Sequence, residues 1–460
     1  IAIIALTVHL ADILSDAGSQ QYIIQKQNTD NDDINTAWTF DVISKCMLTI
    51  FIILLAPLIA QTLSNPLLTE AIQVVALSIP FRALRNPGLI LLAKEFEYGK
   101  LFKLALYQKF ISFSTVMLIV VVTPSYWAII GGDIISALVL FAGSYRINQY
   151  RPKITLIRFR EQWSFSKWSL LRGLTGFIRS QADILIVSKI FAPASLGNYH
   201  LQRELALIPA LSLVIPATEP LLSAVAKAKH DQELLSYRIR LSMLTLLGFL
   251  LPLSCFIYIY SENITLVILG EQWLPYHQLL SYFSLMFFAY CLHALVSDFF
   301  TALNHMKSLF IFDLISTVFI LGILLSAIND NLIEFSVIRG IAGLCITVSL
   351  VLLLNHLKPF KIQYLVCNLI PIVLAIVTTI LISKFTNMSF LNAQPPLLIL
   401  IADTALFFTL YILLFFAFTK SYCWIMRDKM HIAIDASELI RYTEDQFNRL
   451  KHLNIRQPQK

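Results

Sequence analysis

The sequence is poor in charge for its length. Of its 460 residues, 14% are Asp, Glu, Lys or Arg, whereas 57% are hydrophobic. Soluble domains carry about 25% charged residues, so this composition argues against a soluble globular protein. Long apolar runs with few charges predict an integral membrane protein instead.

Motifs for disulfides, metals and catalysis are also absent. The six cysteines are scattered, without a CxxC pair or a Cys/His cluster, so we expect neither a disulfide framework nor a metal site. No phosphate-binding loop, HExxH or GxSxG motif occurs. We therefore predict a protein that is not an enzyme and has no cofactor. The basic residues behind the net charge of +7 lie in short loops, which indicates membrane orientation rather than a nucleic-acid partner.

One acidic loop resembles a metal site. Asp30 and Asp32 have the Asp-x-Asp spacing with which glycosyltransferases hold a metal-bound nucleotide. They lie in a short loop, and no nucleotide-binding domain is attached to it. We therefore favour a polar turn.

Thirteen apolar runs are long enough to cross a bilayer, at about 20 residues each. They lie near 1–24, 34–61, 68–93, 101–123, 126–146, 163–190, 197–226, 236–261, 275–303, 308–328, 333–356, 362–384 and 396–420. Three prolines in the run at 197–226 predict a bent element, because proline removes a backbone hydrogen bond.

The loops between these runs predict the orientation. With the loop at 25–33 placed in the cytoplasm, the loops on that side contain Lys94, Lys100, Arg151, Lys153, Arg158, Arg160, Lys227, Lys229, Lys307 and Lys358. The loops on the opposite side contain no Lys or Arg. This asymmetry follows the positive-inside rule and predicts a cytoplasmic C-terminus.

Weak internal repeats predict two lobes. LLAPL at 54–58 resembles FLLPL at 249–253, and STV occurs at 114–116 and again at 316–318, so the two offsets are similar. The span at 163–190 would then have its counterpart before residue 1, so we expect that the chain lacks the first helix of its first lobe. The predicted organisation is an N-terminal lobe at 1–150, a C-terminal lobe at 151–357, two additional transmembrane helices at 358–420 and a cytoplasmic tail at 421–460.

The stretch RGLTGFIRSQADILIVSK, residues 172–189, places charge inside an apolar run. At 100° per residue, Arg172, Gly176, Arg179 and Asp183 fall on one helix face. A charge at membrane depth costs roughly 3 kcal/mol and faces protein or water rather than lipid. We predict that this face lines a polar cavity where the two arginines bind an anionic substrate, because guanidinium binds phosphate bidentately. The alternative is an internal Arg179–Asp183 ion pair that only joins helices.

Further charges lie inside the predicted spans. Arg82 and Arg85 either line the same cavity or extend to the cytoplasmic surface. Arg203 also belongs to the predicted binding residues; its neighbour Glu204 points about 100° away on a helix, so we expect the two not to pair. The remaining intramembrane candidates are a pair formed by Asp41 and Lys45, a proton relay formed by His293 and Asp298, two ion-coupling residues, Asp183 and Glu219, and the charges Asp313 and Arg339.

Several segments, taken in order, resemble a known family. They are ILSDAGSQQYIIQKQ (13–27), TAW (36–38), LLAPLIA (54–60), ADILIVSKIFAPASLGNYHLQRELALIPA (182–210) and ILGEQWLPYHQLL (268–280). The chain resembles the bacterial oligosaccharide-repeat flippases, which export lipopolysaccharide and capsule precursors. These proteins belong to the multidrug/oligosaccharidyl-lipid/polysaccharide exporter superfamily.

The resemblance implies an all-α polytopic membrane protein with two pseudo-symmetric six-helix lobes and two C-terminal helices. It implies alternating-access export of a polyprenyl-diphosphate-linked oligosaccharide across the bacterial inner membrane. The expected partners are this lipid-linked substrate, membrane lipids, a polysaccharide polymerase and glycosyltransferases. One alternative is an ion-coupled exporter of small cationic drugs, which would favour an acidic cavity. Another is a membrane structural or division protein without transport.

Overall fold

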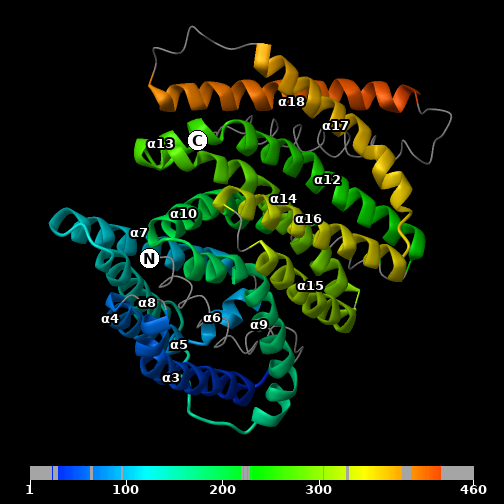
Figure 1. Ribbon diagram of the computed structural model, residues 1–460. Coiled ribbons are helices and arrows are strands. Elements are labelled where there is room, and N and C mark those ends of the chain that lie inside the picture. Colours follow the sequence, from blue (N-terminus) through cyan, green and yellow to red (C-terminus); the bar gives the residue numbers. More distant parts are fainter. Residues whose placement is uncertain are drawn as a thin grey trace, which may run out of the picture. The chain divides into compact units, whose positions relative to one another are not determined.

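The computed structural model describes residue 23 and residues 29–62, 66–94, 97–218, 221, 225, 228, 231–303, 305–327, 331–385 and 395–425. Within these residues, helices are the only regular secondary structure (Figure 1). Nine helices in this part of the chain are long and apolar enough to cross a membrane. The predicted all-α, multi-pass membrane fold is therefore confirmed.

The chain divides into two compact units, Ile1–Gly197 and Asn198–Lys460. The helices described in the first unit are α3 (Asn31–Thr62), α4 (Leu67–Ala76), α5 (Ser78–Ala83), α6 (Gly88–Lys94), α7 (Tyr98–Val122), α8 (Trp127–Ile147) and α9 (Phe159–Ile190). Helix α10 (Pro193–Pro209) crosses the boundary between the units. It is followed by η1 (Ala210–Val214), α12 (Gln232–Ile259), α13 (Ser261–Ile268), η2 (Glu271–Tyr276), α14 (His277–Ala302), α15 (Met306–Ser326), α16 (Leu332–Leu357), α17 (Ile362–Phe385) and α18 (Pro396–Ile425).

Small residues allow the helices of the first unit to pack closely. A Cβ on Gly132 of α8 would clash with Val116 Cγ2 of α7, so a larger residue fits there only if the Val116 side chain shifts. Ser112 Oγ donates a 2.8 Å hydrogen bond to the Gly132 carbonyl at the same contact. Within a bilayer, close approach and interhelical hydrogen bonds stabilise packing where hydrophobic burial contributes little.

The span expected at 68–93 is divided into the three helices α4, α5 and α6, so the prediction of one continuous helix is wrong. Pro80 has no N–H to bond the carbonyl four residues earlier. At Leu77, between α4 and α5, the backbone N–H instead bonds the Val74 carbonyl at 3.2 Å. Pro87 then disfavours helical backbone at Asn86, and the chain turns before α6.

The span at 197–226, which we expected to be bent, departs from a regular α-helix within its described part, and the bend itself stays a prediction. Helix α10 ends at Pro209 and continues as the π-helical turn η1. Such turns widen the backbone and weaken the regular hydrogen-bond ladder. Of the two later prolines of this span, Pro216 lies in helical backbone directly after η1, and Pro220 lies outside the described residues.

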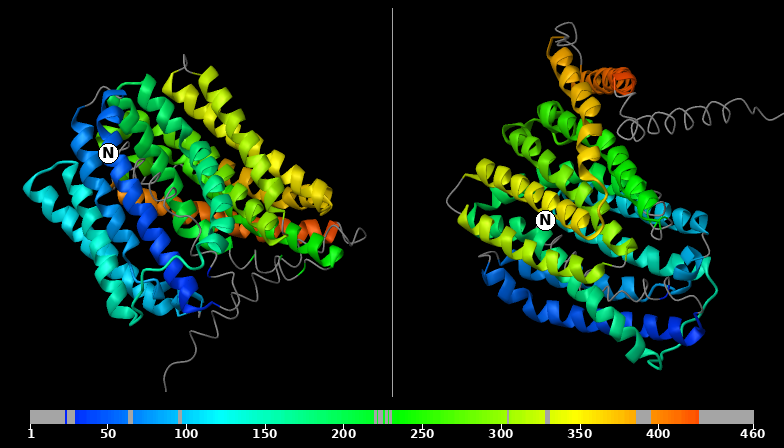
Figure 2. Two further views of the ribbon diagram at one scale, coloured as in Figure 1. Left: turned by 90° about the horizontal axis from the view of Figure 1, so that it is seen from below. Right: turned by 90° about the vertical axis from the view of Figure 1, so that its right-hand side faces the viewer.

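In the second unit, α14 and α16 form a close pair. A Cβ on Gly340 of α16 would lie 3.0 Å from Leu285 Cβ and 3.3 Å from the Tyr282 carbonyl oxygen, both on α14. Helix α16 also packs against α15, and these two helices, drawn in yellow, lie side by side in both views of Figure 2. Helices α17 and α18 contact each other and α12, and α18 also contacts α13 (Figure 1).

The predicted lobe limits remain a prediction. Helix α9, which we expected to open the second lobe, belongs to the first compact unit. The last membrane helix, α18, ends at Ile425, five residues beyond the expected limit of 420. The rest of the predicted tail and the span at 1–24, apart from Ile23, lie outside the described residues.

Candidate functional site

Arg82, one of the predicted binding residues, contacts a carboxylate. It forms an ion pair between α5 and α8 with Asp133, and each side chain is 24% exposed. Sequence reasoning missed this partner, although Asp133 is the single acidic residue of α8. A lone acid inside an apolar span is itself a signal of a polar interior. The pair leaves both side chains partly accessible.

The intramembrane pair predicted on α3 is confirmed. Lys45 Nζ lies 2.8 Å from Asp41 Oδ2, and both side chains are mostly buried. Lys45 is about four turns into α3, so this pair lies well inside the span. Arg85, another predicted binding residue, lies two residues after the end of α5 and is half-buried. Its carbonyl accepts a 3.2 Å hydrogen bond from Trp38 Nε1, which ties α3 to this turn.

Helix α9 contains the charged stripe predicted from the sequence. Arg179 is half-buried and Asp183 is fully buried. A Cβ added to Gly176, on the same stripe, would meet no described atom within 4 Å. Within the described part of the chain, the stripe is therefore open at Gly176. Arg172 lies on the same helix, two turns before Arg179, and the proposed binding roles of both arginines stay predictions.

Arg203 and Glu204 form an ion pair, which corrects the expectation that they would not. Arg203 Nη1 lies 3.1 Å from Glu204 Oε1 on α10. The Cα–Cβ bonds diverge by about 100°, but both side chains are long enough to bend around the helix and meet. Arg203 is 2% exposed and Glu204 is 46% exposed. Glu219, the other predicted ion-coupling residue besides Asp183, lies outside the described residues.

The acidic loop forms the start of α3. Asp33 N–H donates to Asp30 Oδ1 at 2.7 Å, and Asp30 N–H donates to Asp33 Oδ2 at 3.2 Å. This reciprocal pattern is a capping box, in which side chains satisfy backbone N–H groups that the first helical turn leaves free. The observed arrangement agrees with the polar turn favoured above and uses the Asp30 carboxylate for capping.

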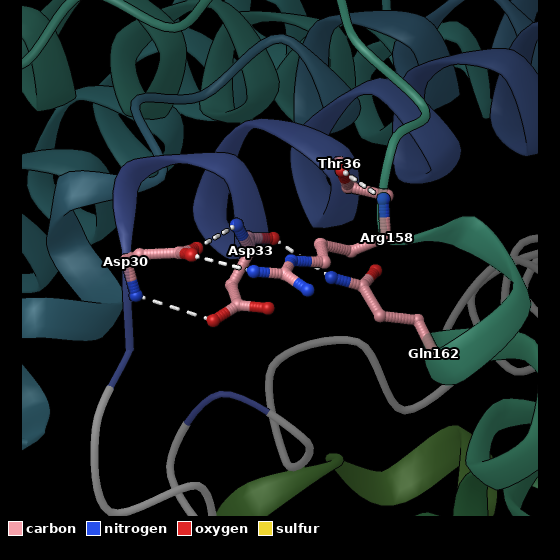
Figure 3. A network of polar contacts seen from close by, with 5 residues as sticks. All are labelled: Asp30, Asp33, Thr36, Arg158 and Gln162. Carbon is pink, nitrogen blue, oxygen red and sulfur yellow. Dashed lines mark hydrogen bonds and ion pairs between the residues drawn. The ribbon is translucent and has the colours of Figure 1, made fainter.

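An ion pair adds to this cap (Figure 3). Arg158, directly before α9, places Nη2 3.1 Å from Asp30 Oδ2. The hydrogen bond from the Asp33 N–H, and to a smaller extent the Arg158 guanidinium, lower the pKa of Asp30 below its ordinary value. The same carboxylate raises the pKa of Arg158. Both groups are solvent-exposed, so the pair contributes little energy by itself.

The connection between α8 and α9, residues 148–158, is held along the start of α3. The backbone N–H of Lys153 donates to Asn35 Oδ1 at 3.0 Å, and that of Thr155 donates to Thr39 Oγ1 at 3.1 Å. The Arg158 N–H donates to Thr36 Oγ1 at 3.3 Å. We refer to residues 148–158 with these α3 contacts as the α3 strap. Its polar backbone is satisfied by α3 side chains, so it is an ordered segment rather than a loose tether.

The start of α9 packs on the same end of α3. Gln162 Nε2 donates a 2.8 Å hydrogen bond to the Asp33 carbonyl (Figure 3). The rings of Phe40, Phe159 and Trp163 lie with centroids 5.3 to 6.0 Å apart. These contacts explain why α9 belongs to the first compact unit.

The histidine of the predicted relay has a different acidic neighbour. His293 Nε2 on α14 lies 3.7 Å from Asp313 Oδ1 on α15. Asp298 is five residues after His293, about 140° away around the helix. Pairing across helices is not visible in a sequence pattern, so this contact was missed. No group of three potential metal ligands occurs among the described residues.

Comparison with known proteins places these features in a family context. Residues 1–278 match the family model described as "Polysaccharide biosynthesis protein". The chain is 26% identical over 287 residues to the lipopolysaccharide biosynthesis protein WzxC of Escherichia coli (strain K12), covering 59% of this chain and 57% of WzxC. It is 20% identical over 270 residues to the teichuronic acid biosynthesis protein TuaB of Bacillus subtilis (strain 168), covering 57% and 56% of the two chains. The chain thus spans a little over half the length of the curated relatives it matches.

Solved structures share the fold. The lipid II flippase MurJ in an inward closed conformation superposes with a TM-score of 0.73 at 15% identity, over 93% of this chain and 92% of that one. The crystal structure of a MATE point mutant superposes with a TM-score of 0.50 at 12% identity, over 78% and 86%. At such identities the likeness describes the helical fold alone.

Proposed function

Because the chain belongs to the family of polysaccharide biosynthesis proteins, we propose that its full-length protein is a flippase rather than an enzyme. Its substrate would be an oligosaccharide linked to a polyprenyl diphosphate, moved from the cytoplasmic to the outer leaflet of the bacterial inner membrane. The named activities of relatives support this class of substrate: WzxC and TuaB are named for surface polysaccharides, and MurJ for lipid II.

The proposed substrate contacts are arginines. The diphosphate binds Arg179, assisted by Arg172. Arg203 of the second unit is a separate proposed binding residue, as are Arg82, which is paired with Asp133, and Arg85 in the first unit. Arginine suits this role because its guanidinium stays charged and matches phosphate oxygens in a bidentate geometry. Asp183 and Glu219 are the proposed ion-coupling residues.

One observation carries this assignment most directly. Arg179 is half-buried on a stripe that is open at Gly176, and Asp183 is fully buried one turn further along. A guanidinium can bind the phosphate oxygens of a substrate diphosphate in a bidentate geometry. Among the described residues, the space beside Gly176 on this stripe leaves room for such a group.

The proposed topology follows the basic loops. The α3 strap, with Arg151, Lys153 and Arg158, lies on the cytoplasmic side, and the C-terminus is cytoplasmic. Two lobes, at 1–150 and 151–357, alternate in access, and the helices of 358–420 lie beyond them. A polysaccharide polymerase and glycosyltransferases are the proposed partners, because they would consume and supply the lipid-linked substrate.

Complementation of a flippase-null strain tests the binding assignment. Arg179→Ala and Arg172→Ala in the full-length protein should abolish surface glycan, while Arg160→Ala, an exposed arginine in the first turn of α9, should retain it. Membrane levels of each variant are compared first. Arg179→Lys should recover only part of the export, because lysine keeps the charge without the bidentate geometry.

A double variant separates substrate binding from a structural pair. If Arg179 only neutralises Asp183, the variant Arg179→Gln/Asp183→Asn removes both charges and should still bind the lipid-linked oligosaccharide. If Arg179 binds the diphosphate, the double variant should lose this binding, whereas Asp183→Asn alone should keep it even if ion coupling is lost. Normal export by Arg179→Ala would refute the cationic site, and resistance to lipophilic cations without glycan export would favour a drug exporter.

A further inference from the structure

A His–Asp contact joins two membrane helices of the second unit. His293 Nε2 of α14 lies 3.7 Å from Asp313 Oδ1 of α15, and the side chains are only 14% and 5% exposed. Both helices belong to the candidate membrane spans. Ionisable side chains at membrane depth are costly, and chains of Asp, Glu and His there commonly carry protons.

The two residues lie inside their spans rather than at the ends. His293 is more than four turns from the start of α14, and Asp313 is two turns from the start of α15. The Asp313 carbonyl accepts hydrogen bonds from Ser316 Oγ at 3.0 Å and Thr317 Oγ1 at 2.7 Å. This turn of α15 is therefore polar while the rest of the helix is strongly apolar.

A fixed positive charge lies close by on α16. Arg339 is 5% exposed. A Cβ on Gly343 would lie 3.7 Å from Arg339 Nη1 and 3.3 Å from the Cβ of Ala289 on α14. Ala289 is one turn before His293, so the guanidinium lies about one turn along α14 from the imidazole.

The remaining titratable groups occupy other positions on α14 and on the elements packed against α14 and α15. Asp298 and His277 share α14 with His293, but Asp298 points about 140° away and His277 opens the helix. The other charged or histidine side chains on elements packed against α14 and α15 lie in the first three turns or the last turn of those elements: Glu233, Arg238, Arg240, Glu262, Glu271, Lys307, Glu334 and His356. The cysteine thiols on α14 and on the elements packed against α14 and α15 are Cys291 of α14, Cys255 of α12 and Cys345 of α16.

We propose that His293 and Asp313 form a proton-binding site within the second unit. A proton from water binds the imidazole nitrogen that faces Asp313 and forms an imidazolium–carboxylate pair. Its release to water restores the neutral imidazole. A metal cation is a poorer occupant, because the Arg339 guanidinium repels it and imidazole is not a preferred ligand of sodium.

The site has a suitable charge balance for loading and unloading. With His293 neutral, Asp313 and Arg339 cancel, whereas binding of one proton leaves a net charge of +1 in a low-dielectric region. If α14 and α15 have two arrangements that solvate this charge differently, the protonated site favours the better solvated arrangement and the neutral site favours the other. The role of the proton in driving export rests on the proposed function, but proton binding does not.

Nuclear magnetic resonance of 15N-histidine in the full-length protein, held in lipid nanodiscs, tests proton binding directly. The chain has nine histidines, and the signal missing from His293→Gln or His293→Asn identifies His293. We expect this signal to convert between neutral and protonated forms within about pH 5–8. Asp313→Asn should abolish the conversion in that range. His356→Gln, which removes an exposed histidine at the end of α16, should leave it unchanged.

Export provides a second readout. Proton uptake during transport in proteoliposomes should fall to background in both His293→Gln and Asp313→Asn. Asp183→Asn is measured in the same assay as a separate variant. A His293 signal that stays neutral from pH 5 to 8, converts equally in Asp313→Asn, or responds to sodium rather than pH would overturn the proton site. Inactive wild-type vesicles with an intact His293 titration would refute the flippase proposal alone.

Discussion

The Arg82–Asp133 ion pair offers a direct test of how the first unit is held together. The perturbation is the set Arg82→Gln, Asp133→Asn and the double variant. Each single substitution leaves one charge inside the unit without its partner across the α5–α8 contact. The double variant removes both charges and leaves two polar amides of similar size.

The expected cost follows from the exposure of the pair. Removing one member of a fully buried pair costs about 3–5 kcal/mol, whereas an exposed pair contributes about 0–1 kcal/mol. At 24% exposure on each side, we expect each single substitution to cost about 1–3 kcal/mol in the free energy of unfolding. The double variant should recover part of this loss, with a coupling energy of about 0.5–3 kcal/mol.

Chemical unfolding of the purified protein in detergent gives the four free energies of this double-mutant cycle. Ser136→Ala is a suitable control. Ser136 lies one turn after Asp133 on α8, and its hydroxyl accepts a hydrogen bond from Gln108 of α7. Additive losses, with no recovery in the double variant, would show that the two side chains do not interact and would refute the α5–α8 contact.

Three further predictions concern other contacts. The pKa of Asp30 is lowered from 3.8 in the folded state, so its stabilisation of the α3 cap is complete above about pH 3.8 and is lost as the pH falls below it. The rate of hydrogen exchange at the Asp33 N–H should therefore rise below this pH. The rise should be smaller in Asp30→Asn, which has no carboxylate to protonate. Because the α3 strap is fixed, a disulfide in Thr39→Cys/Thr155→Cys, made in a cysteine-free background, should leave export unchanged; loss of export under oxidising conditions would identify the strap as a hinge. Tyr411 donates a 2.5 Å hydrogen bond from α18 to the Gly248 carbonyl of α12, so Tyr411→Phe should lower stability by about 0.5–1.5 kcal/mol, and an unchanged thermal unfolding curve would contradict this bond.

The helical fold could be predicted because the bilayer imposes a simple rule. A chain that crosses lipid must satisfy its backbone internally, so long apolar runs predict helices one by one. The run at 68–93 departs from this rule, because Pro80 and Pro87 interrupt the backbone hydrogen bonds of the helix. Hydropathy alone does not reveal this interruption. The lobe limits are harder, because the side chains of Asn35, Thr36 and Thr39 hold the strap from more than a hundred residues away.

The charged residues of the site were partly predictable. The spacing of Asp41 and Lys45 on one helix correctly predicted their pair, because i, i+4 neighbours are fixed by helix geometry. Some partners lie on different helices, such as Asp133 for Arg82 and Asp313 for His293. The spacing of residues within one helix does not show which helices pack together, so these pairs were missed. The Arg203–Glu204 pair shows that the Cα–Cβ direction is a poor guide for long side chains.

Transbilayer movement of the lipid-linked oligosaccharide is the measurement that tests the central claim most directly. The full-length protein is reconstituted into vesicles with a polyprenyl-diphosphate oligosaccharide, and a glycan-cleaving enzyme added outside reports how much substrate reaches the outer leaflet. The account predicts nearly complete access with the wild type, and access limited to the initial outer-leaflet half with Arg179→Ala. Equal access in wild-type and protein-free vesicles would contradict it.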